Sequence, residues 1–408
     1  MTQPDYEHDI CIIGGAGHVG LPLGLVFANE GKRVVLYDLN KAALDDIAQG
    51  RVPYMERDAE SLLRNVLDRQ TLQVSTDVAV VGKAASVIIT IGTPIDEFMN
   101  PVFEGIQQCL EAICPYLSEA QLIVLRSTVY PGTTVWFDKY LRRLGKCLKV
   151  SFCPERVVQG LAIREIHDLP QLISGTTPEA VQAAQQVFAA ITAEQVVLEP
   201  MEAEFAKLFN NAYRYIEFAI ANQFYMITNS AGVDYYRVLE GMQKDYPRAR
   251  GIPKAGFAAG PCLYKDTLQL SAFAANNFSL GNAAVLINEG MVLYLIDQLK
   301  LQYDLSAMKI GLLGMAFKAD IDDIRSSLSY KLKKHLARLA KAVVTTDPHV
   351  TLDRELLPLE DVLTDSDLLI LCVPHSAYRA IDLRGKPTID IWGFLAAGRE
   401  NVVRVLVG

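Results

Sequence analysis

The stretch "DICIIGGAGHVGLPLGLVFANEG", residues 9–31, decides the fold of the N-terminal part of the chain. It begins as a short apolar run typical of a buried strand, passes through glycines, and continues with apolar residues at helical spacing. Gly15, Gly17 and Gly20 have the G-x-G-x-x-G spacing. Glycines at these positions permit a tight turn, close approach of a pyrophosphate to the backbone, and close packing of the helix on the strand. We therefore predict a strand–loop–helix unit that binds a dinucleotide.

The cofactor is predicted from an acid that follows the glycines. Asp38 lies eighteen residues after Gly20, near the end of the apolar stretch "KRVVLYDLN" (32–40). A carboxylate there accepts hydrogen bonds from both ribose hydroxyls and repels a 2′-phosphate, which favours NAD over NADP. Amides at the start of the helix point at the phosphates. The residues of this region expected to bind NAD are Gly15, Gly17, His18, Val19, Gly20 and Asp38.

Short apolar runs alternate with helical segments through the rest of the N-terminal half, at residues 85–94, 121–129 and 148–155. Such alternation predicts a parallel sheet covered by helices on both faces. Residues 201–232 then carry apolar residues at helical spacing for more than two dozen positions, with no strand signal. We expect one long helix there, which joins two domains and offers an apolar surface for a dimer contact.

A second alternating region starts at "MKIGLLGMAF" (308–317), and its later strands are expected in residues 342–348, 367–374 and 387–393. The predicted fold class is α/β, with two Rossmann-like doubly wound domains joined by a helical connector that contains the long central helix. The predicted domains are residues 1–200, a central helical region at 201–300, and residues 301–408.

Composition narrows the class of protein. A chain of 408 residues is expected to form two or three domains. Its formal net charge of -8 argues against nucleic acid and membrane surfaces as partners, because both are polyanionic. The N-terminus lacks the apolar run of a signal peptide, and no apolar stretch reads as a membrane span. Seven scattered cysteines without a C-x-x-C pair predict neither disulfides nor a metal site. We expect a reduced, cytoplasmic enzyme.

The stretch "AGPCLYKD" (259–266) places Cys262 close to Lys265 and Asp266. A free cysteine is usually a small buried hydrophobe, so either packing or nucleophilic chemistry explains this stretch. If a helix starts near Cys262, its N-terminus and Lys265 lower the pKa of the thiol. Asp266 then lies on the same helix face and can steer or deprotonate a water molecule. Cys153 is the rival nucleophile, but neither an adjacent base nor a helix start favours it.

Four further stretches place polar and charged side chains at predicted strand ends or on one helix face. Singly, each is explained by a cap, a turn or a solvated charge; together they supply anion binders, an acid and a cation. They are "RSTVYPGTT" with Ser127 and Thr128, "CPERVVQG" with Glu155 and Arg156, "EFAKLFNN" with Lys207 and Asn211, and "AFKADIDDIRSS" with Lys318, Asp322, Asp323 and Arg325. His375 in "CVPHSAY" is expected to be a loop or nucleotide-contact residue.

Six ordered motifs, spread from about residue 10 to about residue 392, resemble those of the UDP-glucose/GDP-mannose dehydrogenase family. They are "GAGHVGLP", "IGTP", which contains Thr93, "STVYPGTT", "AKLFNNA", "AGPCLYKD" and "AFKADIDDIR". The resemblance implies an NAD domain at 1–200, a central region at 201–300 that carries the catalytic cysteine loop and a dimer contact, and a UDP-sugar domain at 301–408.

The resemblance also implies a reaction: the C6 alcohol of a nucleotide sugar is oxidised twice, to a carboxylate, and two NAD are reduced. The Cys262 thiolate attacks the intermediate aldehyde to give a thiohemiacetal, which is oxidised to a thioester that water cleaves. We expect a homodimer or higher homo-oligomer, no metal, and a role in surface polysaccharide biosynthesis.

Roles for individual residues follow from the same resemblance. Lys207 is implied to stabilise oxyanions and Asn211 to position water and substrate, while Glu155 and Thr128 act at the reacting carbon. The implied cofactor residues outside the glycine loop are Thr93, Thr128, Lys265 and Arg325. The implied substrate residues are Glu155, Arg156, Lys207, Asn211, Arg248, Gly260, Phe317 and Lys318, of which Arg248 reaches a neighbouring subunit in several relatives.

The sugar is predicted from the stretch "CPERVVQG", in which Arg156 replaces an aromatic residue usual in family members that act on UDP-glucose. With "YPRAR" (246–250), it is more similar to dehydrogenases of UDP-N-acetylmannosamine and UDP-N-acetylglucosamine. Departures from the family pattern include Gln159 in place of a proline, Gly92 in "IGTP", and Ala259 and Pro261 before the cysteine.

Other functions stay open at this point. One is a UDP-glucose 6-dehydrogenase, which makes UDP-glucuronate. A β-hydroxyacid dehydrogenase of the 6-phosphogluconate type shares the glycine loop and the Lys-x-x-x-Asn helix, but it needs neither Cys262 nor a second α/β domain. A non-catalytic sensor of NAD or a nucleotide sugar is the remaining alternative; the joint presence of Cys262, Lys207, Asn211 and Asp266 argues against it.

Overall fold

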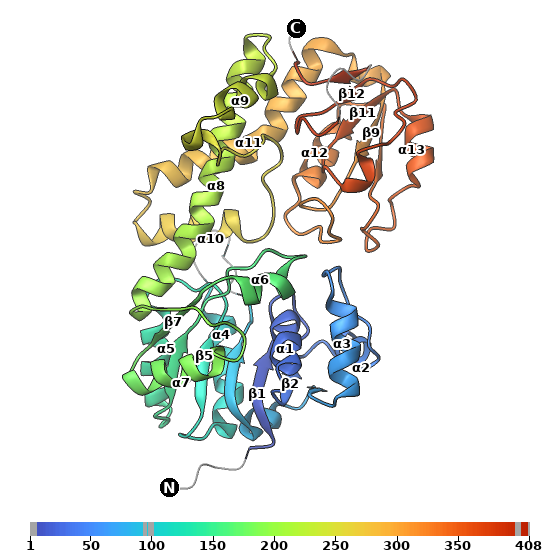
Figure 1. Cartoon of the computed structure of the whole chain (residues 1–408). Coiled ribbons are helices and arrows are strands. Elements are labelled where there is room, and N and C mark those ends of the chain that lie inside the picture. Colours follow the sequence, from blue (N-terminus) through green and yellow to red (C-terminus); the bar gives the residue numbers. More distant parts are fainter. Residues whose placement is uncertain (1–5, 93–95, 97–101, 396–400, 407–408) are drawn as a thin grey trace. The chain divides into compact units, whose positions relative to one another are not determined.

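The computed structural model describes residues 6–92, 96, 102–395 and 401–406 (Figure 1). Thr93, expected to contact the cofactor, lies outside the described residues. The chain divides into two compact units, Met1–Asn210 and Asn211–Gly408. The central helical segment and the C-terminal α/β segment therefore belong to one unit, and the boundary falls within a helix.

The first unit is built on a sheet of eight strands in the order β3-β2-β1-β4-β5-β6-β7-β8. All neighbours are parallel except β6 and β7. The strand order reverses at β1 and β4, and ligands bind at such a switch point beyond the carboxyl ends of the strands. The strands are β1 (His8–Ile13), β2 (Val34–Tyr37), β3 (Leu72–Ser75), β4 (Ala84–Ile89), β5 (Leu122–Leu125), β6 (Lys149–Phe152), β7 (Gln171–Gly175) and β8 (Gln195–Val197).

Both faces of this sheet are buried. Ile10 and Ile12 of β1 lie in one apolar cluster, whereas Cys11 and Ile13 lie in a second cluster, because alternate side chains of a strand point to opposite faces. The covering helices are α1 (Gly20–Asn29), α2 (Lys41–Ala48), α3 (Ala59–Asp68), α4 (Glu104–Ile113), α5 (Thr133–Arg143), α6 (Ala162–Asp168) and α7 (Pro178–Phe188). The predicted doubly wound sheet is confirmed.

The expected long helix is α8 (Pro200–Ser230), which has 31 residues and begins in the first unit. Its buried Glu204 accepts hydrogen bonds from the backbone N–H of Gly132 (2.6 Å) and Thr134 (2.8 Å) and from the Thr134 hydroxyl (2.6 Å). Burial raises the pKa of Glu204. The carboxylate caps the start of α5, so it ties α8 to the Pro-Gly-Thr-Thr turn.

The second unit contains a parallel sheet in the order β10-β9-β11-β12-β13. Its strands are β9 (Lys309–Leu313), β10 (Ala342–Thr346), β11 (Leu368–Leu371), β12 (Thr388–Ile389) and β13 (Val402–Val403). Its helices, after the end of α8, are α9 (Tyr235–Gln243), α10 (Leu263–Phe273), α11 (Ser279–Gln302), α12 (Leu328–Leu336) and α13 (Leu359–Asp365). Within the described residues of both units, short 3₁₀ turns lie at Val78–Lys83, Cys114–Tyr116, Pro247–Ala249, Leu305–Ala307 and Ser376–Tyr378.

Among the described helices, α11 has the length and hydropathy (1.4) of a membrane span, contrary to the expectation that no stretch would. One side of this helix packs into the core of the second unit. Asn288 is fully buried, accepts a hydrogen bond from Asn222 of α8 (2.9 Å) and donates one to the Tyr215 carbonyl (2.9 Å). Met291 and Leu295 belong to the main apolar cluster of the second unit.

Candidate active site

Two glycines of the loop that leads from β1 into α1, Gly15 and Gly20, have no room for a side chain. A Cβ atom at Gly20 would lie 2.3 Å from the Gly14 carbonyl oxygen, and one at Gly15 would lie 2.6 Å from the Leu36 Cβ. Asp38, directly after β2, accepts a hydrogen bond from Ala16 N (3.0 Å) within this loop. The bare backbone and the neighbouring carboxylate fit the phosphates and a ribose of NAD.

His18 connects the glycine loop to a second loop. Its ring lies 3.8 Å from that of Tyr54, measured between centroids, and the Tyr54 hydroxyl donates to the Gly17 carbonyl (2.9 Å). The Gln159 amide contacts His18 Nδ1 at 3.1 Å. Gln159, which departs from the family pattern, thus joins the loop that carries Glu155 and Arg156 to the glycine loop. The sequence did not predict this contact, because it depends on residues far apart in the chain.

Glu56 holds the same second loop from another side. Its buried carboxylate accepts hydrogen bonds from the backbone N–H of Gly160 (2.8 Å) and Ala162 (2.8 Å), at the start of α6. Tyr54 and Glu56 are two residues apart, so one short segment supports both the dinucleotide loop and the Glu155–Arg156 loop. Neither residue was singled out from the sequence.

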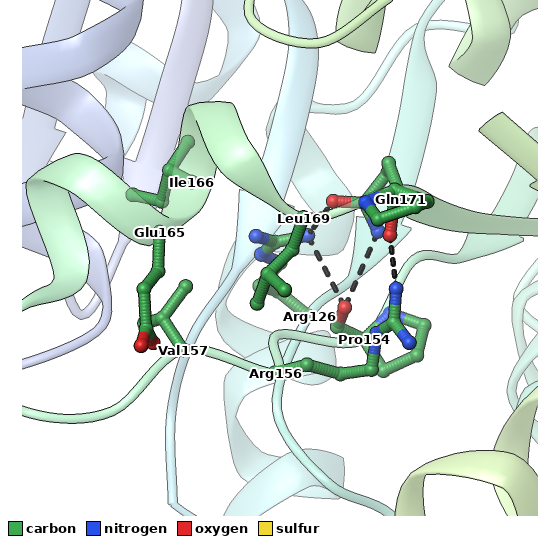
Figure 2. Close-up of a pocket in the computed structure, with 9 residues that line it drawn as sticks. Arg126, Pro154, Arg156, Val157, Glu165, Ile166, Leu169 and Gln171 are labelled. Carbon is green, nitrogen blue, oxygen red and sulfur yellow. Dashed lines mark hydrogen bonds between the residues drawn. The ribbon is translucent and has the colours of Figure 1, made fainter. Parts of the chain in front are cut away.

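The Glu155–Arg156 loop is fixed at its other end by Arg126, which is 2% exposed. Arg126 Nη1 donates to the Cys153 carbonyl (3.0 Å). It also donates to the Pro154 carbonyl (3.4 Å) and to the Gln171 side chain (2.6 Å), as Figure 2 shows. Burial lowers the pKa of Arg126. Because these acceptors are backbone and amide oxygens, Arg126 acts as a clamp on the strand end. Its position directly before Ser127 and Thr128 was the only signal of it in the sequence.

Arg126, Pro154, Arg156 and Gln171 line a small pocket (Figure 2). In it the Arg156 side chain donates to the Pro170 carbonyl, and burial lowers the pKa of Arg156. The Glu155 carboxylate accepts from Val157 N, so it turns back on its own loop. Thr128 is half-buried, two residues after Arg126. The structure thus brings Arg126 and Arg156 together, but among the described residues neither guanidinium forms an ion pair with the Glu155 carboxylate.

Cys262 is the N-cap of α10 and is exposed. The helix start that the sequence analysis required is therefore present, and its N-terminus favours the thiolate. Gly260 has φ of +109°, and a Cβ there would lie 2.8 Å from the Phe317 ring. Phe317 therefore packs on the loop two residues before the cysteine, and only glycine fits that position.

Two of the expected catalytic residues, Asn211 and Asp266, meet one turn after Cys262, together with Lys265. Asp266 is fully buried; its carboxylate accepts a hydrogen bond from Asn211 Nδ2 (2.5 Å) and lies 3.4 Å from Lys265 Nζ. Its backbone N–H donates to the Cys262 carbonyl (2.9 Å). Lys207, 7% exposed, lies one turn before Asn211 on the same face of α8.

The rival cysteine is unsuited to nucleophilic chemistry. Cys153 is fully buried, and burial raises its pKa to about 12. Elsewhere, Arg325 is paired with Asp323 (2.6 Å) in the loop that also carries Phe317 and Lys318. Arg248 is exposed, with Nη1 3.4 Å from the Tyr246 hydroxyl.

In the described part of the chain, the potential metal ligands that lie close together are Asp320, His349 and His375, whose ligand atoms are within 4.8 Å of one another. His375 Nδ1 already accepts the Asp320 N–H (2.9 Å), and Asp320 Oδ1 already accepts the Ser376 N–H (2.8 Å). We assign no metal to this group, because two of its three ligand atoms are engaged.

Comparison with known proteins identifies the architecture. Three domain models of the UDP-glucose/GDP-mannose dehydrogenase family match the chain: the NAD binding domain at residues 8–192, the central domain at 201–290 and the UDP binding domain at 311–397. The chain belongs to this family. It is therefore an NAD-dependent nucleotide-sugar dehydrogenase, an oxidoreductase with NAD as its cofactor.

Individual relatives match over nearly the full length. The chain is 28% identical to an NDP-N-acetyl-D-galactosaminuronic acid dehydrogenase from Ralstonia solanacearum, over 94% of this chain and 96% of that one. The solved structure of a UDP-D-ManNAc dehydrogenase from Pyrococcus horikoshii is similar with a TM-score of 0.89 at 26% identity, over 98% of this chain and 100% of that one. A UDP-glucose dehydrogenase from Pyrobaculum islandicum, at 24% identity over 98% of each chain, has the same fold (TM-score 0.88).

The burial of the cysteines predicts their reactivity. Iodoacetamide at neutral pH is expected to modify the exposed Cys262 and Cys147 and to spare Cys153 and Cys11, whose pKa values burial raises to about 12. Site-resolved mass spectrometry of the folded protein measures this pattern, with urea-unfolded protein as the control in which all seven cysteines react. Modification of Cys153 as fast as Cys262 would contradict the assignment.

Proposed function

We propose that the protein oxidises the C6 alcohol of a UDP-N-acetylhexosamine to the carboxylate, through a covalent adduct on Cys262. The observation that carries this proposal is the exposed Cys262 at the start of α10, with the buried Asp266 held beside it by Asn211 and Lys265. An alternative in the same family is oxidation of UDP-glucose to UDP-glucuronate.

The chemistry of a double oxidation explains why a cysteine is needed. Bound NAD supplies the hydride acceptor in both oxidation steps. The thiolate of Cys262 adds to the carbonyl carbon of the aldehyde, forming a C–S bond and a thiohemiacetal, which again carries a C–H bond that can be lost as hydride. The resulting thioester is cleaved by water, which releases the acid and the thiol. In sum, one alcohol, one water and two NAD+ give one carboxylate, two NADH and three protons.

The polar residues around Cys262 have distinct proposed roles. Asp266 receives or directs the proton of the attacking water, and Asn211 holds its carboxylate by the 2.5 Å hydrogen bond. Lys207, with Asn211 on one helix face, stabilises the oxyanion of each tetrahedral adduct. Lys265 favours the thiolate. The remaining proposed site residues are Thr128, Glu155 and Gly260 near the sugar, Thr93, Thr128 and Arg325 near NAD, and Phe317, Lys318 and Arg248 on the nucleotide.

The stoichiometry of the wild type and of cysteine variants tests the covalent mechanism. Each sugar consumed is expected to yield two NADH, because the aldehyde stays bound. Cys262→Ala and Cys262→Ser should lower acid formation at least about a thousandfold, since an alcohol is far less ionised than a thiol. Titration of NADH against UDP-sugar, with mass spectrometry of the product, measures this.

Cys153→Ala is the matched control and is expected to keep most of the activity, because Cys153 is buried and protonated. Full two-NADH turnover by Cys262→Ala would refute the role of the thiol.

The choice of an N-acetylated sugar is supported by the Glu155–Arg156 loop. Arg156 occupies the place of an aromatic residue and is held by the Pro170 carbonyl. Arg126, Gln171 and Glu56 fix the backbone on both sides of it, so the loop presents one defined surface to a ligand. The relatives named for N-acetylated sugars, at 28% and 26% identity, also support this choice.

A substrate panel tests the sugar. UDP-N-acetylmannosamine and UDP-N-acetylglucosamine are expected to give a kcat/KM at least about tenfold above UDP-glucose, UDP-galactose and GDP-mannose, because a polar guanidinium replaces the aromatic surface at position 156. Initial rates of NADH formation measure this. A clear preference for UDP-glucose would favour the alternative reaction, and binding of NAD and UDP-sugars without any NADH would favour a sensor.

We further propose that two or more copies associate through an apolar face of α8 and that the enzyme works in the cytoplasm. The exposed side chains Phe209, Tyr213, Ile220, Phe224 and Ile227 recur every three to seven residues, so they share one side of the helix. Exposed apolar stripes of this kind typically mark protein interfaces. We propose that residues 1–200 bind the cofactor and that residues 201–300 carry the nucleophile and the oligomer contact. Residues 301–408 are proposed to bind the UDP-sugar.

Substitution on α8 tests the association. Ile220→Glu and Phe224→Glu place charges in the apolar face and are expected to convert the wild-type oligomer to monomers, as measured by light scattering after gel filtration. Leu352→Glu is the control, because Leu352 is more exposed (79%) and lies outside α8. A monomeric wild type would contradict the proposal.

A further inference from the structure

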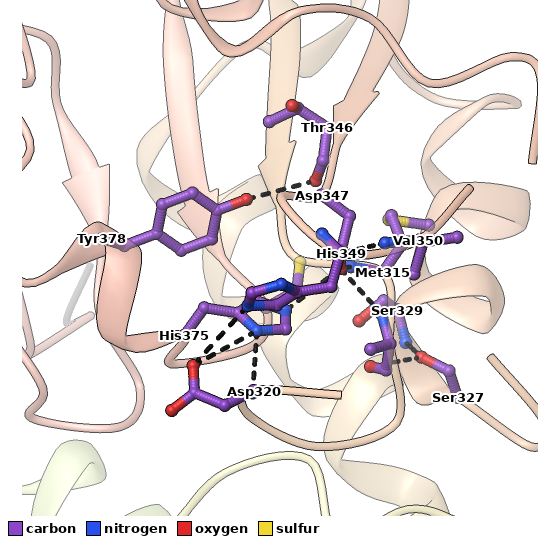
Figure 3. A network of polar contacts seen from close by, with 12 residues as sticks. Met315, Asp320, Ser327, Ser329, Thr346, Asp347, His349, Val350, His375 and Tyr378 are labelled. Carbon is purple, nitrogen blue, oxygen red and sulfur yellow. Dashed lines mark hydrogen bonds and ion pairs between the residues drawn. The ribbon is translucent and has the colours of Figure 1, made fainter. Parts of the chain in front are cut away.

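Asp347, directly after β10, accepts five hydrogen bonds through a side chain with no exposed surface. Oδ2 accepts from the backbone N–H of Met315 (2.6 Å) and Ala316 (3.0 Å), and Oδ1 accepts from His349 N (2.8 Å) and Val350 N (3.1 Å). The fifth partner is His375 Nε2, 3.0 Å from Oδ2 (Figure 3). These partners hold the pKa of Asp347 well below its usual range.

His375 lies in a loop, as the sequence predicted, and its side chain is fully buried. Nδ1 accepts a hydrogen bond from the backbone N–H of Asp320 (2.9 Å). The ring proton is therefore on Nε2, which donates a hydrogen bond to Asp347. Asp320 has φ of +57°, a left-handed conformation that is unfavourable for a residue with a side chain. The imidazole therefore links Asp347 to the backbone of Asp320, and so helps to hold the middle of the loop at residues 315–327 in place.

That loop contains two of the proposed nucleotide residues, Phe317 and Lys318. It is closed on itself by Phe317 N donating to the Asp323 carbonyl (2.9 Å) and by the Ser327 hydroxyl donating to the Ala316 carbonyl (3.1 Å). The Phe317 ring packs against Gly260, two residues before Cys262. A shift of the 315–327 loop would therefore change the position of the Cys262 loop.

Asp38 in the first unit occupies the same position in its sheet as Asp347 does in the second, but the two carboxylates differ in burial. Asp38 also follows the second strand of its sheet directly and also binds the loop after the first strand, through Ala16 N. Asp38 keeps a half-buried carboxylate with one bond to that loop, which suits a ligand-binding acid. The Asp347 carboxylate is fully buried and accepts five hydrogen bonds from the protein, so its role is to hold the backbone around it.

We propose that Asp347 and His375 are positioning residues of the active site, which hold the 315–327 loop so that Phe317 and Lys318 bind the nucleotide and Phe317 fixes the Cys262 loop. The proposal rests on the proposed function, because that function assigns the nucleotide to this loop. Neither residue is catalytic, since both side chains are enclosed.

Three variants remove different hydrogen bonds of the Asp347–His375 pair. Asp347→Asn removes one of the two oxygens that accept backbone N–H groups. His375→Gln keeps a donor near Asp347 but loses the acceptor for Asp320 N, and His375→Asn does the reverse. Asp347→Asn is expected to raise the KM for the UDP-sugar at least about tenfold, and each His375 variant about threefold or more, since each loses hydrogen bonds to or through a buried charge.

Two further measurements distinguish positioning from general damage. The rate of Cys262 alkylation by iodoacetamide, and its protection by UDP, should change at least about threefold in the three variants. The Kd for NAD should change less than the KM for the UDP-sugar, because the glycine loop and Asp38 lie in the first unit and Arg325 is the one proposed NAD residue in the 315–327 loop. Leu363→Ala is the control: it opens a cavity in a different apolar cluster of the same sheet and should alter the melting temperature but neither KM nor the alkylation rate.

The inference is overturned if the variants that fold keep the wild-type KM for UDP-sugar and the wild-type alkylation of Cys262. It is also overturned if Leu363→Ala changes both as much at an equal loss of melting temperature. Should Asp347→Asn fail to fold, the two His375 variants decide. Failure of the wild type to oxidise any UDP-sugar would instead reject the proposed function, and alkylation with UDP protection would still decide the positioning role.

Discussion

A carboxylate that follows the second strand of each sheet accepts backbone N–H groups from the loop that follows the first strand. Asp38 does this for the loop after β1, and Asp347 does it for the loop after β9. Backbone donors just beyond a strand end have no partner in the ladder, and leaving them buried and unpaired is costly. Each carboxylate removes that cost and at the same time sets the shape of a ligand-binding loop.

The same principle organises the rest of the site. Glu204 caps α5 behind the Pro-Gly-Thr-Thr turn, and Glu56 caps α6 behind the Glu155–Arg156 loop. Arg126 is the inverse case, a buried cation that holds carbonyl groups instead of N–H groups. Charged groups that are enclosed and hydrogen-bonded to the backbone act on function through the backbone they hold, whereas the partly exposed ones remain available for ligands.

Burial also separates the two cysteines that compete for the role of nucleophile. Both lie near charged residues in the sequence, but Cys153 ends a strand inside the sheet, where desolvation disfavours the thiolate. Cys262 lies at an exposed helix start, where partial positive charge favours it. A nucleophile that must be regenerated after every thioester hydrolysis needs the second environment.

The sequence by itself determined the architecture, because strand and helix periodicity and the glycine spacing are local properties of the chain. It predicted a sheet of largely parallel strands in each unit, the long helix α8 and the shared helix face of Lys207 and Asn211. The helix start at Cys262 was a condition of the proposed chemistry, and the structure supplied it. The sequence missed the short strands β3, β7, β8 and β13, whose few residues carry too little pattern.

Tertiary structure alone decided which polar residues hold the site. Gln159 meets His18 across 141 positions of sequence, and Asp347 meets Met315 across 32 and His375 across 28. Such pairs leave no periodic signal, since a single polar residue in a loop looks the same whether it is solvated or enclosed. Only the fold shows that His375 is sealed against Asp347, because burial depends on which distant segments pack around a residue.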